Sequence, residues 1–217
     1  LKTLADVGDS EETDLERGRA LHSLAHIERK MGLEDLSMKH FRGAVDVFNS
    51  SAARHLNSPD VAFDIQMRLA DSYESISALM ENPLSQEALG VLEKAVQHFD
   101  HVIKLKPNDE SVVMRQAGTS FKLGRAYDAH RRYDKAIDSY SKSAELAGSL
   151  REIEGNAPRL TELLGKLQFQ AAKSLRMAGR ADDAINAHVA AMETVELLRG
   201  VNGFTPLQSI QMASSYI

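Results

Sequence analysis

Apolar residues recur with the period of an α-helix along almost the whole chain, and this pattern constrains the fold more than any other feature. Side chains three and four positions apart lie above one another on a helix, so each apolar stripe marks one buried face. One of the clearest stripes is formed by Leu89, Leu92, Val96, Phe99 and Ile103. No segment alternates apolar and polar residues for long enough to predict a strand. We therefore expect an all-α protein with eight helices and the start of a ninth.

The five prolines fall between these stripes and never inside one. Proline is tolerated at the first position of a helix, where its missing N–H would be unpaired anyway, and a preceding Ser, Thr or Asn is a good cap. We expect helices to begin at Ser58-Pro59, Asn82-Pro83, Ala157-Pro158 and Thr205-Pro206. Pro107 closes an apolar helical stretch, and Asn108 after it is expected to cap the next helix.

The predicted helices come in pairs that resemble one another. The clearest pair has Leu123-Gly124-Arg125-Ala126-Tyr127 on its first helix and Tyr133 to Ala144 on its second. Twelve residues separate Gly124 from Ala136, and four separate Ala136 from Tyr140. This spacing resembles the tetratricopeptide repeat, in which small residues mark the close approach of two helices and aromatic residues fill the gap to the next pair.

The same frame fits three more pairs. Their small or apolar positions are Leu24-Ala25 with Ser37 and Phe41, Leu69-Ala70 with Ala95 and Phe99, and Ala172 with Ala184 and His188. The second of these pairs has about thirteen extra residues around Glu81 to Pro83, which we expect to lengthen both helices. The frame recurs roughly every 45–54 residues instead of every 34, which resembles the long-helix arrays of kinesin light chain and soluble NSF attachment protein.

This resemblance implies a right-handed α-solenoid of antiparallel helix pairs, because one pair cannot bury its apolar face alone and must stack on the next. We expect a single repeat domain over residues 1–217, with pairs at about 11–57, 59–106, 109–148 and 158–200 and a partial helix at 205–217. The chain opens at Leu1 rather than Met and closes on an unfinished helix, so we interpret it as a piece of a longer protein.

Composition excludes several other classes. The net charge of −5 argues against nucleic-acid binding, which depends on neutralising phosphates. No apolar run approaches the roughly 18 residues of a membrane helix, so no membrane insertion is expected. With no cysteine, neither disulfides nor thiolate metal sites can form. A cytoplasmic location is expected, because a chain of this size without disulfides suits a reducing compartment.

Two histidine pairs invite a metal-site interpretation. His22 and His26 lie four apart on one predicted helix and could present two imidazoles to one ion, but the sequence fixes no third ligand. His98 and His101 lie on a second helix and are expected to be surface residues. We therefore predict no metal and no cofactor. We also predict no enzymatic activity, because the chain has no phosphate loop, nucleophile elbow or His-Glu-x-x-His motif.

The resemblance places the functional surface on the first helix of each pair, which lines the concave face of such arrays. The implied groove residues are His22, His26 and Arg29 from pair one, Met67, Asp71 and Glu74 from pair two, Phe121, Arg125 and Asp128 from pair three, and Phe169, Lys173 and Arg176 from pair four. They lack the Lys-Asn and Lys-Arg pairs of chaperone-binding members. We expect a peptide or helix of a partner protein in this groove, with an acidic segment favoured by the basic residues at both ends.

Three alternatives remain open at the sequence level. The groove could be solvated or filled by segments of the parent protein. The array could instead be a structural spacer or an oligomerisation module, with the apolar residues Leu207, Ile210, Met212 and Ile217 docking on a neighbour. It could also be a regulatory appendage to a catalytic domain elsewhere in the parent protein.

Overall fold

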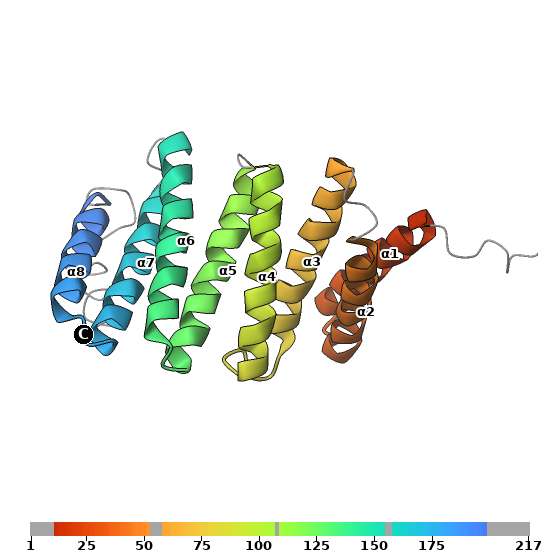
Figure 1. Cartoon of the computed structure of the whole chain (residues 1–217), viewed down its shortest axis with the longest axis horizontal. Helices are drawn as coiled ribbons and strands as arrows, with labels where there is room; N and C mark the ends of the chain where they lie inside the picture. The colour runs from red at the N-terminus through yellow and green to blue at the C-terminus, as the bar shows by residue number, and fades with distance from the viewer. Residues whose placement is uncertain (1–10, 53–57, 107–108, 155–157, 199–217) are drawn as a thin grey trace, which may run out of the picture. The chain divides into compact units, whose positions relative to one another are not determined.

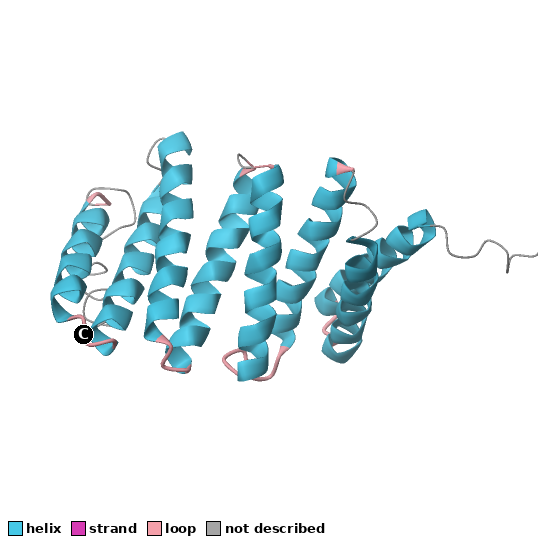
Figure 2. Cartoon of the chain, in the orientation of Figure 1, coloured by secondary structure: helices cyan, strands magenta, loops and turns pink. Residues whose placement is uncertain are grey.

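The computed structural model describes residues 11–52, 58–106, 109–154 and 158–198, and this part of the chain is helical with no strand. Its helices are α1 (Glu11–Lys30), α2 (Glu34–Ala52), α3 (Pro59–Leu79), α4 (Gln86–Leu105), α5 (Glu110–Ala129), α6 (Tyr133–Glu154), α7 (Pro158–Met177) and α8 (Ala181–Glu196). Figure 1 labels them in chain order, and Figure 2 shows short loops between them. The all-α prediction is confirmed.

The chain forms two compact units, unit 1 (Leu1–Pro107) with α1 to α4 and unit 2 (Asn108–Ile217) with α5 to α8. Within unit 1, α1 packs on α2, α2 on α3 and α3 on α4. Within unit 2, α5 packs on α6, α6 on α7 and α7 on α8. Consecutive helices therefore pair as the repeat pattern predicts. No described helix is long and apolar enough to cross a membrane.

Capping residues at the helix starts explain where the sequence prediction agrees with the structure and where it fails. Helix α3 begins at Pro59 with Ser58 as its cap, as expected. Helix α5 is capped by Asp109, whose carboxylate accepts the Val112 N–H at 3.2 Å. Asn108, the expected cap, lies outside the described residues, as do Ala157 and the predicted helix start at Thr205-Pro206.

The prediction that a helix begins at Asn82-Pro83 is wrong. The Asn82 side chain accepts the backbone N–H of Leu84 at 3.1 Å, which stabilises a turn and not a helix start. Ser85 then caps α4 by accepting the Ala88 N–H at 3.1 Å. Two good capping residues lie three positions apart, and the local turn of the first leaves the second to start the helix.

The turns within three of the pairs share one hydrogen-bond pattern. In each, an N–H just past a left-handed residue donates to a carbonyl five positions back: Leu33 to Glu28, Arg132 to Tyr127, and Arg180 to Leu175. The left-handed residues are Gly32 (φ 75°), Arg131 (φ 55°) and Gly179 (φ 79°). This is a Schellman C-cap, for which glycine is favoured because it has no Cβ. Arg131 adopts the same conformation at a cost of roughly 1–2 kcal/mol.

One close helix–helix approach in unit 2 lies at Gly124. A Cβ atom built there would lie 2.6 Å from Cε1 of Tyr140, a ring that is fully buried between the helices. The interpretation of Gly124 as the small residue of a tight crossing therefore agrees with the structure. Gly18 and Gly165 stand at similar crossings, 2.8 Å from Phe48 and 2.6 Å from Val195, and the sequence frame did not point to them.

Gly124→Ala is expected to lower the free energy of unfolding by about 1–3 kcal/mol, because the added methyl group forces Tyr140 out of its packed position. Gly118 lies on the same helix, and a methyl group added there would meet no neighbouring side chain or helix within 4 Å. Gly118→Ala should therefore raise stability by about 0.5–1 kcal/mol through helix propensity alone. Urea unfolding followed by circular dichroism would check both, and equal effects of the two variants would contradict the tight crossing.

Candidate functional site

Three side chains predicted to line a groove meet in unit 1. His22 and His26 project from the same side of α1, and Asp71 projects from α3. The Nε2 atoms of both histidines lie within hydrogen-bond distance of one oxygen, Asp71 Oδ2, at 2.8 Å from His22 and 2.5 Å from His26. The three side chains are 11%, 31% and 15% exposed, so the cluster is shielded and opens to solvent mainly at His26.

The neighbours of His22 determine which of its ring nitrogens carries the proton. Arg68 Nη1 lies 3.3 Å from His22 Nδ1, and a guanidinium can only donate. His22 Nδ1 is therefore the acceptor, and the ring proton lies on Nε2, from which it is donated to Asp71. Arg68 is held in turn by Asp64, whose Oδ1 lies 2.7 Å from Arg68 Nε. Hydrogen bonding thus joins α1 to α3 through charged and neutral groups.

Burial lowers the pKa of His26 below its ordinary value, and this effect outweighs the opposing attraction of the Asp71 carboxylate. The positive charge of Arg29 acts in the same direction as burial. Arg29 itself is exposed and donates from Nη1 to Ser75 Oγ at 3.2 Å. The candidate residues of unit 1 are therefore largely engaged with one another or with α3.

The corresponding surface of unit 2, on α5 and α7, is more open. Asp128 accepts from the Tyr140 hydroxyl at 2.9 Å and from Ser174 Oγ at 2.7 Å, so its carboxylate is held between α5, α6 and α7. Arg125 and Lys173 are exposed, and within the described residues neither side chain has a hydrogen-bond or ion-pair partner. Arg176, one turn beyond Lys173, is exposed too.

The apolar candidates are less accessible than the sequence indicated. Phe169 is only 3% exposed and packs with Ala191 and Val195 of α8, so it is a core residue and not an anchor on the surface. Phe121 is partly buried, with its ring centroid 5.8 Å from that of Tyr140. Met67 is partly buried on α3. Helical period fixes which side of a helix a residue occupies, but the depth of the neighbouring helix decides whether its ring is covered.

His98 is half-buried and packed against α3, and so is less exposed than predicted, while His101 is exposed as expected. The His98 ring stacks on Tyr73 at 5.5 Å with a 6° angle between the planes, and its Nδ1 donates to Gln66 Oε1 at 2.7 Å. Burial lowers the pKa of His98 to about 4, assisted by the charges of His101 and Lys94. His98 therefore belongs to the packing of α4 against α3.

Because the pKa of His98 is depressed in the folded chain, the unfolded chain binds more protons between about pH 4 and pH 6.5. Stability should be full above this window and fall as pH drops through it. His98→Gln should reduce the loss of unfolding free energy between pH 7 and pH 5 by about 2 kcal/mol. His101→Gln is the matched control and should leave it unchanged. Urea titrations at both pH values measure this, and an unchanged pH dependence in His98→Gln would contradict it.

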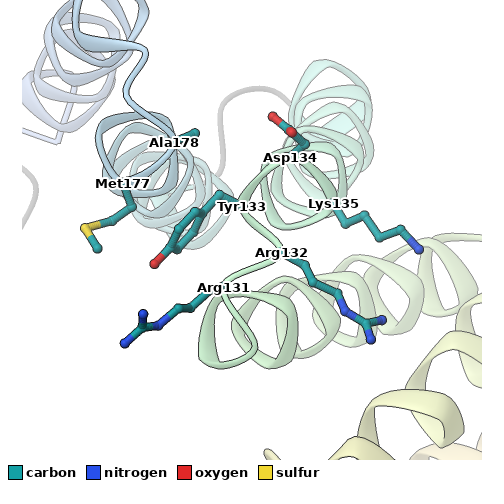
Figure 3. Close-up of a pocket in the computed structure, with 7 residues that line it drawn as sticks. All are labelled: Arg131, Arg132, Tyr133, Asp134, Lys135, Met177 and Ala178. Carbon is teal, nitrogen blue, oxygen red and sulfur yellow. The ribbon is translucent and has the colours of Figure 1, made fainter.

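A hollow of about 460 Å³ lies beside the α5–α6 turn of unit 2, lined by residues 131–135 with Met177 and Ala178. Figure 3 shows Arg131, Tyr133 and Met177 projecting to one side of the turn, while Arg132 and Lys135 point to the other. Lys135 Nζ lies 5.5 Å from the centroid of the Tyr127 ring. The cations therefore diverge and do not surround one anion position.

An apolar stripe is exposed on α8. Ile185, Val189 and Met192 are 60%, 50% and 60% exposed and lie four and three residues apart, on one side of the helix. Ser37 of α2 and Ala184 of α8 occupy the same position in the repeat. By this alignment Met38 corresponds to Ile185 and Val45 corresponds to Met192, and both α2 residues pack in the core shared with α3. Within the described residues, α8 has no helix on this side. The apolar segment predicted to dock on a neighbour, 207–217, lies outside them.

Comparison with known proteins places a tetratricopeptide repeat in unit 2. The family model for this repeat matches residues 117–149, which contain most of α5 and α6. The predicted tetratricopeptide-like character of the chain is thereby confirmed. A search of curated proteins finds no match.

Solved structures with a similar fold are helical-repeat proteins. A de novo designed helical repeat protein is 16% identical, with 95% of this chain and 97% of that chain covered and a TM-score of 0.46. TPR-like repeats assigned to a kinesin light chain of Podosopora anserina are 16% identical, with 93% of each chain covered and a TM-score of 0.40. A tetratricopeptide protein of Thermus thermophilus is 18% identical, with 95% and 98% covered and a TM-score of 0.35.

Proposed function

We propose that this chain is a protein-interaction scaffold and that the α5–α7 surface of unit 2 binds an acidic segment of a partner protein. A tetratricopeptide-like fold supports the general role, since such repeats are typically non-enzymatic scaffolds. The observation that carries the specific proposal is a pair of exposed cations without partners, Arg125 and Lys173, within the described residues. Each follows the small residue of its repeat, Gly124 or Ala172, so both occupy the same position in the frame.

Asp128, the acid one turn after Arg125, makes hydrogen bonds within the fold and, among the described residues, forms no ion pair with those cations. Its two oxygens accept hydrogen bonds from Tyr140 and Ser174. Its carboxylate therefore serves the packing of α5 against α6 and α7. Arg176 adds a further positive charge one turn after Lys173. A carboxylate-rich peptide would gain charge-assisted hydrogen bonds at Arg125 and Lys173.

The same frame position is occupied differently in unit 1. His26 follows Ala25 and Asp71 follows Ala70, and these two side chains contact each other directly. A ligand for this surface would have to break that contact and the bond from His22 to Asp71. For this reason we assign the acidic partner to unit 2.

Selection of displayed random peptides on the immobilised chain tests this proposal even though the partner is unidentified. We expect the selected peptides to be enriched in Asp and Glu. Their binding, measured by fluorescence anisotropy, should weaken at least about tenfold in Arg125→Glu/Lys173→Glu and fall with added salt.

Lys39→Glu/Lys104→Glu is the matched control, because both lysines are exposed in unit 1 and the change in net charge is the same. This control should bind the selected peptides nearly as well as the parent chain. The proposal fails if the peptides show no acidic enrichment, or if the two double variants lose the same affinity.

A second candidate role, self-association, is favoured by the exposed stripe of Ile185, Val189 and Met192 on α8. Burying such a stripe against a second copy would remove apolar surface from water. We expect sedimentation velocity to show a concentration-dependent dimer that Ile185→Lys/Met192→Lys reduces to a monomer. Ile27→Lys, at a 55% exposed position of α1, should leave the dimer intact. A parent chain that stays monomeric at high concentration would exclude this role.

A further inference from the structure

We propose that His22, His26 and Asp71 form a binding site for a zinc-type transition-metal ion within unit 1. One ligand-type atom from each residue lies within 4.8 Å of the other two. The sequence offered only the two histidines, whereas the fold supplies a third ligand from α3, 45 residues beyond His26. The site is separate from the α5–α7 surface and does not depend on its function.

The arrangement matches the ligand number and type that such ions use. Two imidazole nitrogens one helical turn apart and a single carboxylate oxygen provide three protein ligands and leave one position open. Nitrogen-rich sets of this kind favour Zn²⁺, Ni²⁺ or Co²⁺, whereas Ca²⁺ and Mg²⁺ prefer oxygen ligands only. The partial exposure of His26, at 31% of its side chain, provides a path for entry.

The ligand atoms all lie within 4.8 Å of one another, so binding requires the two histidine nitrogens to approach each other and the carboxylate to withdraw slightly. Zn–N and Zn–O bonds of about 2.0–2.2 Å at tetrahedral angles separate ligand atoms by roughly 3.4 Å. The present separations from Asp71 Oδ2 are 2.8 Å for His22 Nε2 and 2.5 Å for His26 Nε2. A rotation of the Asp71 carboxylate would open both distances by less than about 1 Å. The ring protons that now bridge from the Nε2 atoms to Asp71 would move to the Nδ1 atoms, so both imidazoles bind the ion as neutral ligands.

The rings already have a fixed orientation. His26 packs edge-on against Phe41 at a centroid distance of 4.9 Å and an angle of 89°. His22 meets the same Phe41 ring at 5.9 Å and 79°, and Phe41 is fully buried. Packing against Phe41 holds both Nε2 atoms toward α3 and shields the buried side of the rings from water. Less free energy is then needed to orient the ligands when an ion binds.

Arg68 disfavours metal binding and is expected to weaken the affinity for the ion. A metal on His22 Nε2 places the ring proton on Nδ1, which now faces Arg68 Nη1 at 3.3 Å. The Arg68 side chain is 27% exposed, and its Nε is anchored on Asp64, so Nη1 can rotate away while that anchor remains. Removing the Arg68 guanidinium should strengthen metal binding.

Calorimetric titration of the metal-free chain with ZnCl₂ tests the site directly. We expect saturable binding of one ion, weakened at least about tenfold in both His26→Ala and Asp71→Asn and tightened in Arg68→Gln. His101→Ala, at an exposed histidine of the same unit, should bind like the parent chain. CaCl₂ and MgCl₂ should give no saturable heat. Arg125→Glu/Lys173→Glu should leave the zinc titration unchanged, which keeps this test independent of the peptide surface.

Nitrogen NMR of the imidazoles supplies a readout that does not depend on a variant that folds. Zinc should shift the Nε2 resonances of His22 and His26 and leave those of His101 in place. No saturable heat with the parent chain, equal zinc affinity in His26→Ala and the parent, or zinc-induced shifts confined to other histidines would each overturn the proposal.

Discussion

The close approach of α5 and α6 at Gly124 is the contact on which the rest of unit 2 depends. Only a residue without a Cβ leaves room for the Tyr140 ring there. The ring in turn places its hydroxyl on Asp128, whose other oxygen accepts from Ser174 on α7. Gly124 therefore sets the distance between α5 and α6. Through Asp128, the buried Tyr140 then links this pair of helices to α7. Both oxygens of the Asp128 carboxylate are thus used to link the three helices.

Much of this arrangement could be predicted because it depends on period and spacing. The apolar stripes gave the helices, and the frame from Gly124 to Ala136 and Tyr140 gave their pairing. The frame also ranked Arg125 and Lys173 as equivalent positions. It could not reveal that Phe169 is covered by Ala191 and Val195, since that depends on how deeply α8 packs. The burial of a side chain depends on the helices that pack around it, and the sequence of its own helix does not predict how closely they pack.

Polar side chains were the least predictable part of the chain, because their partners lie far away in sequence. Nothing in the sequence near His98 signals that its ring stacks on Tyr73 and donates to Gln66, 32 residues earlier. The competition between Asn82 and Ser85 was also undecidable from the cap rules alone, as both are good caps. By contrast, the left-handed backbone of Arg131 between α5 and α6 could be expected once this residue was aligned with Gly32 and Gly179.

The position after the small residue of each repeat explains why the two units present different surfaces. Within each unit, this position occurs on both first helices, 45 residues apart in unit 1 and about 48 in unit 2. In unit 1 the two occupants, His26 and Asp71, attract and bond to each other, so the surface closes and gains a polar cluster suited to an ion. In unit 2 both occupants, Arg125 and Lys173, are cations that cannot neutralise each other. This difference is the reason for proposing an acidic partner segment for unit 2 and not for unit 1.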